Sequence, residues 1–422
     1  MLDIKFIRDN RDLVVAAANK KKAVLSVDAL LSLDDRRREL TKSIEIKRAE
    51  QNFTNDQIAA AGPDRDSLIV RMKELKQTLQ REEAELVSVL KDWQTLMLAV
   101  PNIPDVSVPD GNDEKDNQEV KVWGDKPLFN FSPKSHVELM TALHMLDLER
   151  GSKVSGFRGY FLKGDAVRLT MAIWQLAFKF FSEKGFEPLI VPSLVRRETL
   201  LGSGYLPQGE DDLYRTQDGD FLAGTGEVAV MSYFAGEVLP HASLPKKLLA
   251  FSPCFRREAG SHGKDTKGIM RVHEFFKFEQ VVLCEANHTE SVKYHEWLNR
   301  NTEEFFELLG LPYRTVVNCG ADLGLGQVKK YDIELWVPSE KAYREIGSTS
   351  YFHDFQTRRL NIRYKEASGK MTFVHSLNAT ALPVPRALVS LIENNQREDG
   401  SIVIPKALRE IFGRDLITGR NQ

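Results

Sequence analysis

Two long stretches near the start of the chain combine a helical spacing of apolar residues with an almost complete lack of glycine and proline. They cover residues 26 to about 60 and then residues 65 to about 100, and the turn-forming residues 61–64 separate them. In the second stretch, steps of three and four select nine positions, of which eight are apolar: Leu68, Met72, Leu75, Leu79, Glu82, Leu86, Val89, Trp93 and Leu96. Such a repeat is typical of a coiled-coil seam. The first stretch is less regular, with apolar residues at compatible spacing at Leu30, Leu33, Leu40 and Ile44. We therefore predict an antiparallel helical hairpin over about residues 27–100.

This hairpin would be too long to be covered by a compact core. Helices of about 33 residues, at 1.5 Å per residue, make an arm on the order of 50 Å long, so we expect it to project. Its polar faces carry many basic residues: Arg36, Arg37, Arg38, Lys42, Lys47, Arg48, Arg71, Lys73, Lys76 and Arg81. In an isolated coiled coil these would usually be solvated flanks, and contacts to RNA phosphates are the alternative.

The pattern changes after the hairpin. Residues 101–120 are turn-rich and acidic, which indicates a linker and predicts an N-terminal domain over residues 1–102 and a second domain over residues 103–422. Beyond the linker, a helical pattern runs from about residue 165 to residue 183, and residues 188–192, 247–251, 279–283 and 331–337 have the character of strands. Helices and strands do not alternate steadily, which favours an α+β fold with an antiparallel sheet over a doubly wound one.

Composition narrows the function only slightly. The chain has 422 residues, enough for two or three domains, and its 58 basic and 60 acidic residues nearly cancel. Binding to RNA would therefore require a local concentration of positive charge. The three cysteines form no CxxC pair, so we expect buried thiols and no zinc site. The pattern shows no signal peptide and no membrane span, which predicts a cytoplasmic protein.

The densest group of reactive residues surrounds Arg256 and Glu258. It precedes one predicted strand and follows another, which predicts a long hairpin. At a spacing of two on a strand, the two side chains would share a face and offer a phosphate clamp beside a carboxylate. An ordinary cross-strand ion pair is the alternative. Residues 260–265 lack the glycine spacing and the final Ser or Thr of a Walker loop.

Two further clusters contain groups that suit nucleotide chemistry. Glu345 and Ser348 supply oxygen ligands that could hold Mg²⁺ against phosphates, although a polar surface turn would look similar. Arg386 stands near the start of a predicted helix, after Asn378 and Thr380, where an arginine favours an anion.

At this point several long segments, in order, resemble one family. Residues 251–261, 265–266 and 271–275 resemble motif 2 of the seryl-tRNA synthetases, which belong to class II. The helix ending near Gly185, with Pro192 after it, is similar to class II motif 1, and residues 378–396 resemble motif 3. Residues 345–348 with 354–360 resemble a seryl-type signature, and residues 222–227 resemble the serine-recognition loop. The resemblance spans essentially the whole chain, and no class I motif is present.

The resemblance implies the fold, the reaction and the site. The fold would be an antiparallel class II catalytic domain with an N-terminal coiled-coil arm, and the reaction would use ATP and Mg²⁺ to attach L-serine to tRNA(Ser), and to tRNA(Sec) where present. The catalytic residues would be Arg256, Glu258 and Arg386. The ATP-binding residues would be Arg256, Arg257, Glu258, Val272, Phe275, Glu345, Ile346, Gly347, Ser348 and Arg386. The serine-binding residues would be Thr225, Gly226, Glu227, Arg256, Glu279, Asn378 and Thr380, and the metal ligands would be Glu345 and Ser348.

The family also implies a homodimer, with Pro192 and the motif 1 helix near the two-fold axis, and an arm that grips the tRNA. The chain departs from the family in motif 3, where Ala379, Ala381, Pro383 and Pro385 replace a glycine-rich pattern, and at Gly226, where alanine is usual. Two alternatives stay open at this stage: a synthetase-like ligase with another acceptor, and a catalytically inactive RNA-binding paralogue.

Overall fold

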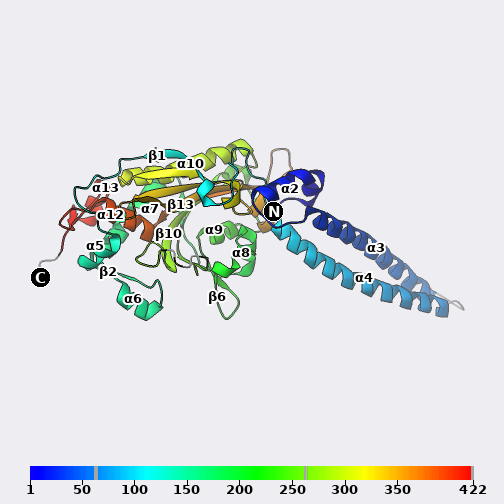
Figure 1. Cartoon of the computed structure of the whole chain (residues 1–422). Coiled ribbons are helices and arrows are strands. Elements are labelled where there is room, and N and C mark those ends of the chain that lie inside the picture. The colour runs from blue at the N-terminus through cyan, green and yellow to red at the C-terminus, as the bar shows by residue number, and fades with distance from the viewer. Residues whose placement is uncertain (61–64, 261–262, 264, 420–422) are drawn as a thin grey trace. The chain divides into compact units, whose positions relative to one another are not determined.

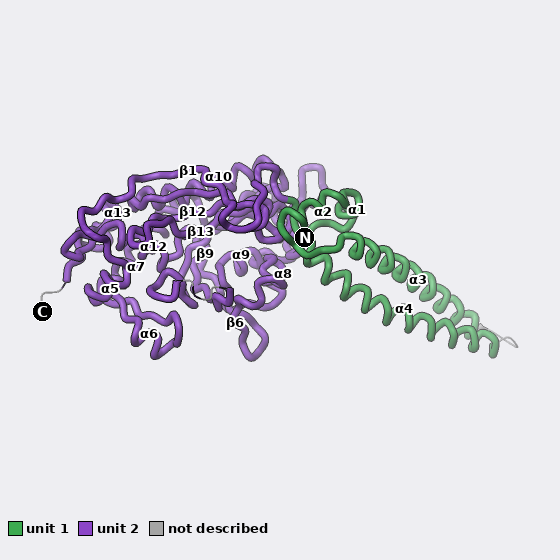
Figure 2. Tube along the Cα trace, viewed as in Figure 1, with its two compact units in different colours: residues 1–103 green, residues 104–422 purple. Residues whose placement is uncertain are grey.

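The computed structural model describes residues 1–60, 65–260, 263 and 265–419. Its contacts divide the chain into two compact units, Met1–Ile103 and Pro104–Gln422 (Figure 2). The first unit is helical, and the second is built around a large sheet (Figure 1).

Unit 1 contains the predicted hairpin. Its helices are α1 (Ile4–Asp9), α2 (Arg11–Lys20), α3 (Val27–Ala60) and α4 (Arg65–Ala99). All nine predicted seam positions of α4 are shielded at least partly from solvent, and Met72, Leu79 and Val89 are buried. On α3, Leu30, Leu40 and Ile44 are buried as well. The coiled-coil prediction is therefore confirmed, while the predicted turn at residues 61–64 lies outside the described residues.

Some basic residues of the hairpin hold its two helices together. The Lys47 ammonium group donates to Glu82, which is the single polar seam position of α4, at 2.9 Å. Arg36 forms an ion pair with Glu85 on the facing helix at 2.6 Å. Arg37 pairs with Asp34, a buried carboxylate, at 2.7 Å. Lys47 and Arg36 thus link α3 to α4, whereas Arg37 and Asp34 both lie on α3.

Unit 2 is organised by an eight-stranded sheet in the order β1-β11-β12-β13-β16-β10-β9-β4. These strands are β1 (Gln118–Trp123), β4 (Glu187–Ile190), β9 (Lys246–Phe255), β10 (Glu274–Cys284), β11 (Tyr313–Val317), β12 (Lys329–Val337), β13 (Ala342–His353) and β16 (His375–Pro383). Every neighbouring pair is antiparallel except β4 and β9, which are parallel. The predicted antiparallel α+β fold is confirmed. Three of the predicted strand regions lie within β9, β10 and β12, and the fourth, residues 188–192, overlaps β4 but extends two residues past its end at Ile190.

Short strands and the remaining helices complete unit 2. The short strands are β2 (Leu146–Asp147), β3 (Phe161–Leu162), β5 (Leu194–Val195), β6 (Tyr214–Arg215), β7 (Phe221–Leu222), β8 (Val238–Leu239), β14 (Arg363–Lys365), β15 (Met371–Phe373), β17 (Ile402–Val403) and β18 (Leu416–Ile417). The helices are α5 (His136–Ala142), α6 (Leu148–Ser155), α7 (Asp165–Glu183), α8 (Arg197–Ser203), α9 (Glu227–Tyr233), α10 (His288–Leu308), α11 (Phe355–Leu360), α12 (Val384–Asn394) and α13 (Lys406–Phe412).

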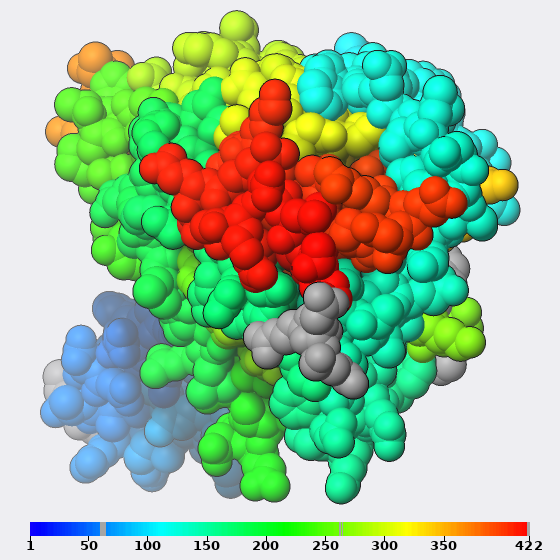
Figure 3. Space-filling view, turned by 90° about the vertical axis from the view of Figure 1, so that its left-hand side faces the viewer, coloured from blue at the N-terminus to red at the C-terminus, as the bar shows by residue number. Residues whose placement is uncertain are grey.

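The main core of unit 2 lies between the sheet and helices α7, α10 and α12. Phe181 of α7, Phe305 of α10 and Leu388 of α12 are fully buried in one cluster with side chains from the central strands. Helix α13, near the C-terminus, packs against α7 and closes this side of the unit (Figure 3, red). The three cysteines are buried and free, as predicted. Among the described residues, no helix has the length and apolar character needed to cross a membrane.

Candidate active site

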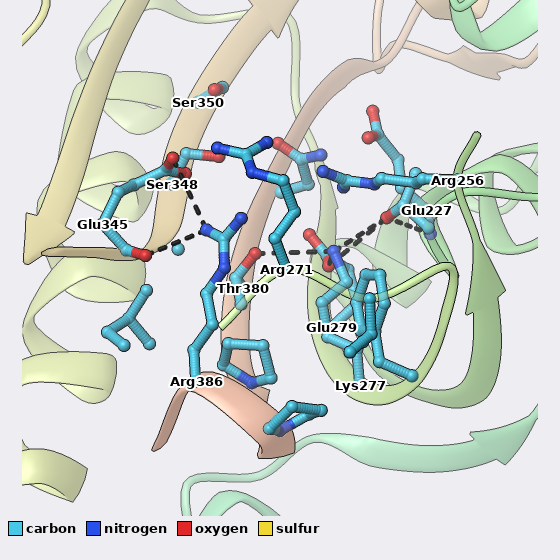
Figure 4. A pocket seen from close by; sticks show the side chains of 18 of the residues that line it. Glu227, Arg256, Arg271, Lys277, Glu279, Glu345, Ser348, Ser350, Thr380 and Arg386 are labelled. Atoms are coloured by element: carbon cyan, nitrogen blue, oxygen red, sulfur yellow. Dashed lines mark hydrogen bonds and ion pairs between the residues drawn. The ribbon is translucent and has the colours of Figure 1, made fainter. Parts of the chain in front are cut away.

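A pocket of about 210 Å³ opens over strands β9, β10, β13 and β16 and the start of α12 (Figure 4). It brings together all but two of the predicted site residues, namely Thr225, Glu227, Arg256, Glu258, Val272, Phe275, Glu279, Glu345, Ile346, Gly347, Ser348, Asn378, Thr380 and Arg386. The two that do not line it are Arg257, which is exposed and donates to the Asp211 carbonyl at 3.2 Å, and Gly226, which is buried at the start of α9.

The predicted strand geometry of Arg256 and Glu258 is wrong. Strand β9 ends at Phe255, and Glu258 has a φ of 56°, in the left-handed region. The two side chains therefore reach the pocket from a loop and not from one strand face. Arg256 donates through Nε to the Gly224 carbonyl at 3.2 Å, and its guanidinium group lies 5.6 Å from the centre of the Phe275 ring. These contacts orient the arginine over the pocket.

The Glu258 carboxylate is held by a neighbour on the returning side of the same hairpin. Arg271 donates to its Oε2 atom at 2.5 Å and also pairs with Asp265 at 3.3 Å. Asp265 in turn pairs with Arg344 of β13 at 2.5 Å. This chain of alternating charges ties the loop between β9 and β10 to the edge of the pocket.

One end of the pocket is formed by β13 and the start of α12. Arg386, the third residue of α12, donates to the Glu345 carbonyl at 2.9 Å and lies 3.6 Å from the Glu345 carboxylate. The positive charges of Arg386, Lys330 and Arg256 outweigh the cost of desolvation and hold the pKa of Glu345 below its ordinary value. The pairing of β12 with β13 has a bulge between Ile333 and Glu334, and Glu345 stands opposite Glu334 at this bulge.

The other end is buried and rich in small hydroxyls. Glu279, Thr225 and Thr380 are each less than a tenth exposed. Glu279 stands directly opposite Thr380 in the pairing of β10 with β16, and Thr225 donates to its Oε2 atom at 3.4 Å. The predicted strand position of Glu279 and the predicted helix-start position of Arg386 are confirmed. Thr380 lies in β16, for which no strand was predicted, and Glu345 and Ser348 lie in β13, which excludes the alternative of a surface turn.

A second carboxylate completes this buried end. Desolvation, followed by repulsion from Glu279, raises the pKa of Glu227 to about 7. Gln356 of α11 donates to Glu227 at 2.6 Å, and Ser376 donates to the other end of the same amide at 2.7 Å, which fixes its orientation. Glu227 is therefore positioned from two sides and poised to change its charge near neutral pH.

Sequence reasoning did not single out Lys277, Arg271 or Tyr205, which also line the pocket. Lys277 lies two residues before the predicted strand 279–283, and it shares the face of Glu279 because β10 already begins at Glu274. Tyr205 lies in a loop far from the motifs in sequence, and no local pattern points to it.

The unusual residues of motif 3 fit their positions. Ala379 and Ala381 alternate with the pocket residues Asn378 and Thr380 along β16, and both alanines are buried in the core. Pro385 lies in the first turn of α12, where proline is tolerated because its missing N–H would have no helical partner. At Gly226, a Cβ atom would approach Ala250 to 3.0 Å and Ser252 to 3.2 Å, so the glycine relieves close packing.

Comparison with known proteins adds independent observations. Residues 1–104 match the model of the seryl-tRNA synthetase N-terminal domain, and residues 214–395 match that of the tRNA synthetase class II core domain (G, H, P, S and T). The serine–tRNA ligase of Deinococcus radiodurans is 44% identical over 422 residues, covering 100% of this chain and 99% of that protein. The serine–tRNA ligase of Caldicellulosiruptor saccharolyticus is 41% identical over 99% of this chain and 100% of its own length.

Solved structures agree. The seryl-tRNA synthetase of Pyrococcus horikoshii complexed with ATP superimposes with a TM-score of 0.90 at 38% identity, covering 99% of this chain and 100% of that one. The cytoplasmic serine–tRNA ligase of Naegleria fowleri in complex with AMP has a TM-score of 0.87 at 29% identity, covering 100% and 99%. Because the identity extends along both units and the pocket retains the charged groups of the motifs, the chain belongs to the seryl-tRNA synthetase family.

Proposed function

We propose that the pocket of unit 2 carries out both steps of serine–tRNA ligation. L-serine and ATP would form seryl-adenylate and pyrophosphate, and the seryl group would then pass to the 3′ end of tRNA(Ser). The observation that carries this proposal is the make-up of the pocket, which joins two arginines, Arg256 and Arg386, to a buried end formed by Glu279, Thr225 and Thr380. Figure 4 shows the two arginines, Glu279 and Thr380. Arginine suits phosphates, and small buried polar groups suit a small polar amino acid.

The open end has the groups that ATP requires. We assign Arg256 to the α-phosphate, Arg386 to the γ-phosphate side and Glu258 to the adenine amino group, with Phe275 stacking on the base. Val272, Ile346 and Gly347 also line the pocket, and we assign them to ATP as well. Arg257 has no role in this proposal because its side chain points to solvent.

The first step exchanges one phosphorus–oxygen bond for another. A carboxylate oxygen of serine attacks the α-phosphorus of ATP, the bond from that phosphorus to the bridging oxygen breaks, and pyrophosphate leaves. Arg256 would stabilise the negative charge that spreads over the α-phosphate oxygens. In the second step, a hydroxyl of the terminal ribose of tRNA attacks the carbonyl carbon of the adenylate, an ester bond forms and AMP leaves.

The donor set at the open end also suits Mg²⁺. Glu345 supplies a carboxylate and Ser348 a hydroxyl, and Mg²⁺ is usually bound by one or two carboxylates together with substrate phosphates. Glu345 and Ser348 would hold the ion, which neutralises phosphate charge when bound.

The buried end would recognise serine. The Glu279 and Glu227 carboxylates would accept from its ammonium group, and the Thr225 and Thr380 hydroxyls, with Asn378, would complete hydrogen bonds to the hydroxyl and carboxylate. A site of this kind rejects alanine strongly, because the missing hydroxyl leaves buried polar groups unpaired.

Two further assignments extend the proposal beyond the pocket. The hairpin of α3 and α4 would bind tRNA(Ser), since its sides carry exposed cations such as Arg38, Lys42 and Lys73. The enzyme would be a homodimer, since α7 leaves a stripe of apolar side chains exposed at Val167, Met171 and Phe178, and Ile190 of β4 is 89% exposed.

The test is the exchange of labelled pyrophosphate into ATP, measured with each of the standard amino acids in turn. We expect exchange that depends on serine and is weaker by several orders of magnitude with alanine. Exchange driven best by another amino acid would refute the assignment of the buried end. Exchange with serine but no esterification of tRNA would point instead to a ligase with another acceptor.

A further inference from the structure

A buried lysine lies in the middle of the proposed serine site. Lys277 of β10 is 5% exposed, and its ammonium group forms an ion pair with Glu279 (Figure 4). The same group donates to Thr225 at 3.0 Å and to Thr380 at 3.4 Å. Its partners are therefore three of the residues that would surround serine, and they come from three separate parts of the chain.

The geometry of strands β10 and β16 places Lys277 close to Glu279 and Thr380. Lys277 and Glu279 are two residues apart on β10, so both side chains point to the same face of the sheet. Thr380 stands opposite Glu279 on β16, and the register shift between Phe278 and Glu279 brings Lys277 opposite Pro383. A long side chain that began on this face could have reached solvent. Lys277 instead keeps its charged end inside, at a cost that only close partners offset.

Two contacts of the Glu279 carboxylate involve the same oxygen atom. Both Lys277 and Thr225 bind the Oε2 atom. Among the described residues, no hydrogen bond is made to Oε1. A carboxylate has about four acceptor positions, so a carboxylate held through one oxygen can still accept from a substrate ammonium through the other. Lys277 thus need not leave when serine enters.

Lys277 also affects the second carboxylate of the pocket, Glu227. Burial and the nearby Glu279 carboxylate raise the pKa of Glu227, because both disfavour its ionised form. The positive charge of Lys277 acts in the opposite direction and lowers the pKa of Glu227.

We propose that Lys277 is a positioning residue of the serine site, whose ammonium group holds the Oε2 atom of Glu279 together with the Thr225 and Thr380 hydroxyls, leaving Oε1 for the ammonium group of serine. The inference rests on the proposed function. It concerns serine alone, since Lys277 contacts none of the groups assigned to ATP.

The experiment uses the full chain and measures serine-dependent pyrophosphate exchange, with serine and ATP varied separately from about pH 6 to about pH 8.5. In Lys277→Met, which keeps the length of the side chain and removes its charge, the KM for serine should rise at least about tenfold at pH 7. The KM for ATP should change by less than about twofold.

Two further variants complete the test. Lys293→Met removes an exposed lysine of α10 and should behave as the unchanged enzyme. Lys277→Arg keeps the charge, so its KM for serine should stay within about threefold of that enzyme, although the guanidinium group is larger. Thermal unfolding establishes that each variant is folded.

Several results would overturn the proposal. A folded Lys277→Arg enzyme with a serine KM raised more than about tenfold would show that charge is not the reason for the lysine. A Lys277→Met enzyme with an unchanged or lower serine KM would show that the lysine is dispensable or competes with the substrate. A rise in KM that is equal for serine and for ATP would indicate a purely structural role. Absence of serine-dependent exchange in the unchanged enzyme would instead refute the proposed function.

Discussion

At the scale of single residues, Arg256 has the clearest expected effect on the reaction. Its guanidinium group is oriented by the Gly224 carbonyl and the Phe275 ring, so it is already in place before substrates bind. We expect Arg256→Ala to lower the rate of serine-dependent exchange by about 10²–10³-fold, because a preorganised charge at the α-phosphate is removed. Pre-steady-state adenylate formation is the measurement. The exposed Arg257, changed to Ala, is the matched control and should have little effect; near-normal adenylate formation in Arg256→Ala would refute the role.

The raised pKa of Glu227 predicts that the affinity for serine depends on pH. Its pKa in the folded protein is about 7, above the ordinary 4.5 of a glutamic acid, so the carboxyl group gains its charge only as the pH rises through neutrality. Serine affinity should therefore increase from about pH 6 to about pH 7.5, by up to about tenfold per unit, and then level off. Over the window between these two pKa values the folded state holds a proton that the unfolded chain releases, so the contribution of this group to stability falls as the pH rises.

The measurement is the KM for serine across this pH range, in the unchanged enzyme and in Glu227→Gln. The glutamine variant should bind serine weakly, and the part of the pH dependence that Glu227 causes should disappear. A variant that retains the full pH dependence would assign it to another group.

At the scale of elements, helix α7 shows how one sequence pattern serves two surfaces. One side of the helix, including Leu169, Ile173 and Phe181, is buried in the core, while Val167, Met171 and Phe178 stay exposed at spacings of four and seven. We expect the exposed stripe to form the dimer contact. Met171→Glu should shift the protein from dimer to monomer at micromolar concentration in sedimentation velocity, because a charge cannot be buried there without a partner.

An apolar residue exposed on another helix provides the control for this experiment. Leu308 of α10 is 44% exposed, and Leu308→Glu should leave the dimer intact. A monomer in the unchanged protein, or equal dissociation by both variants, would contradict the assignment of α7.

At the scale of the whole molecule, the proposed function assigns binding of tRNA to one unit and activation of serine to the other. Every residue assigned to ATP or serine lies in unit 2, and the hairpin lies in unit 1. Deleting residues 27–100 and rejoining the chain near Asn102 should leave serine-dependent exchange within about twofold, while transfer to tRNA should fall by at least about 10²-fold because the acceptor end is no longer positioned. Loss of exchange would show that the arm is needed by the catalytic unit.

The structure also selects the best residues for a milder test of the arm. Arg36 links α3 to α4 through Glu85, and Arg37 pairs with the buried Asp34 of its own helix, so changing either would disturb the fold of the arm. Arg38 and Lys42 are exposed, and neutralising these two should weaken tRNA binding. The slope of log affinity against log salt should fall by about one for each phosphate that the arm no longer neutralises. An unchanged salt slope would place the binding surface for tRNA elsewhere.

The sequence by itself determined the elements and the reaction class. The seam of α4, the bounds of α7 and the strands β10 and β12 followed from the spacing of apolar residues, because that spacing reflects the local backbone geometry of helices and strands. The motif residues identified the chemistry because each motif is short and continuous.

Only the tertiary structure decided how these pieces meet. Thr225 and Glu279 are 54 residues apart, and Lys277 and Thr380 are 103 apart, so their contacts depend on strand register and on the path of loops. The left-handed backbone at Glu258 and the Arg271 contact to its carboxylate arise from the loop between β9 and β10, where no periodic pattern exists. Lys277 had the sequence signal of its strand face, but its buried ion pair became visible only when three distant segments enclosed it, because burial of a charge depends on everything that surrounds it.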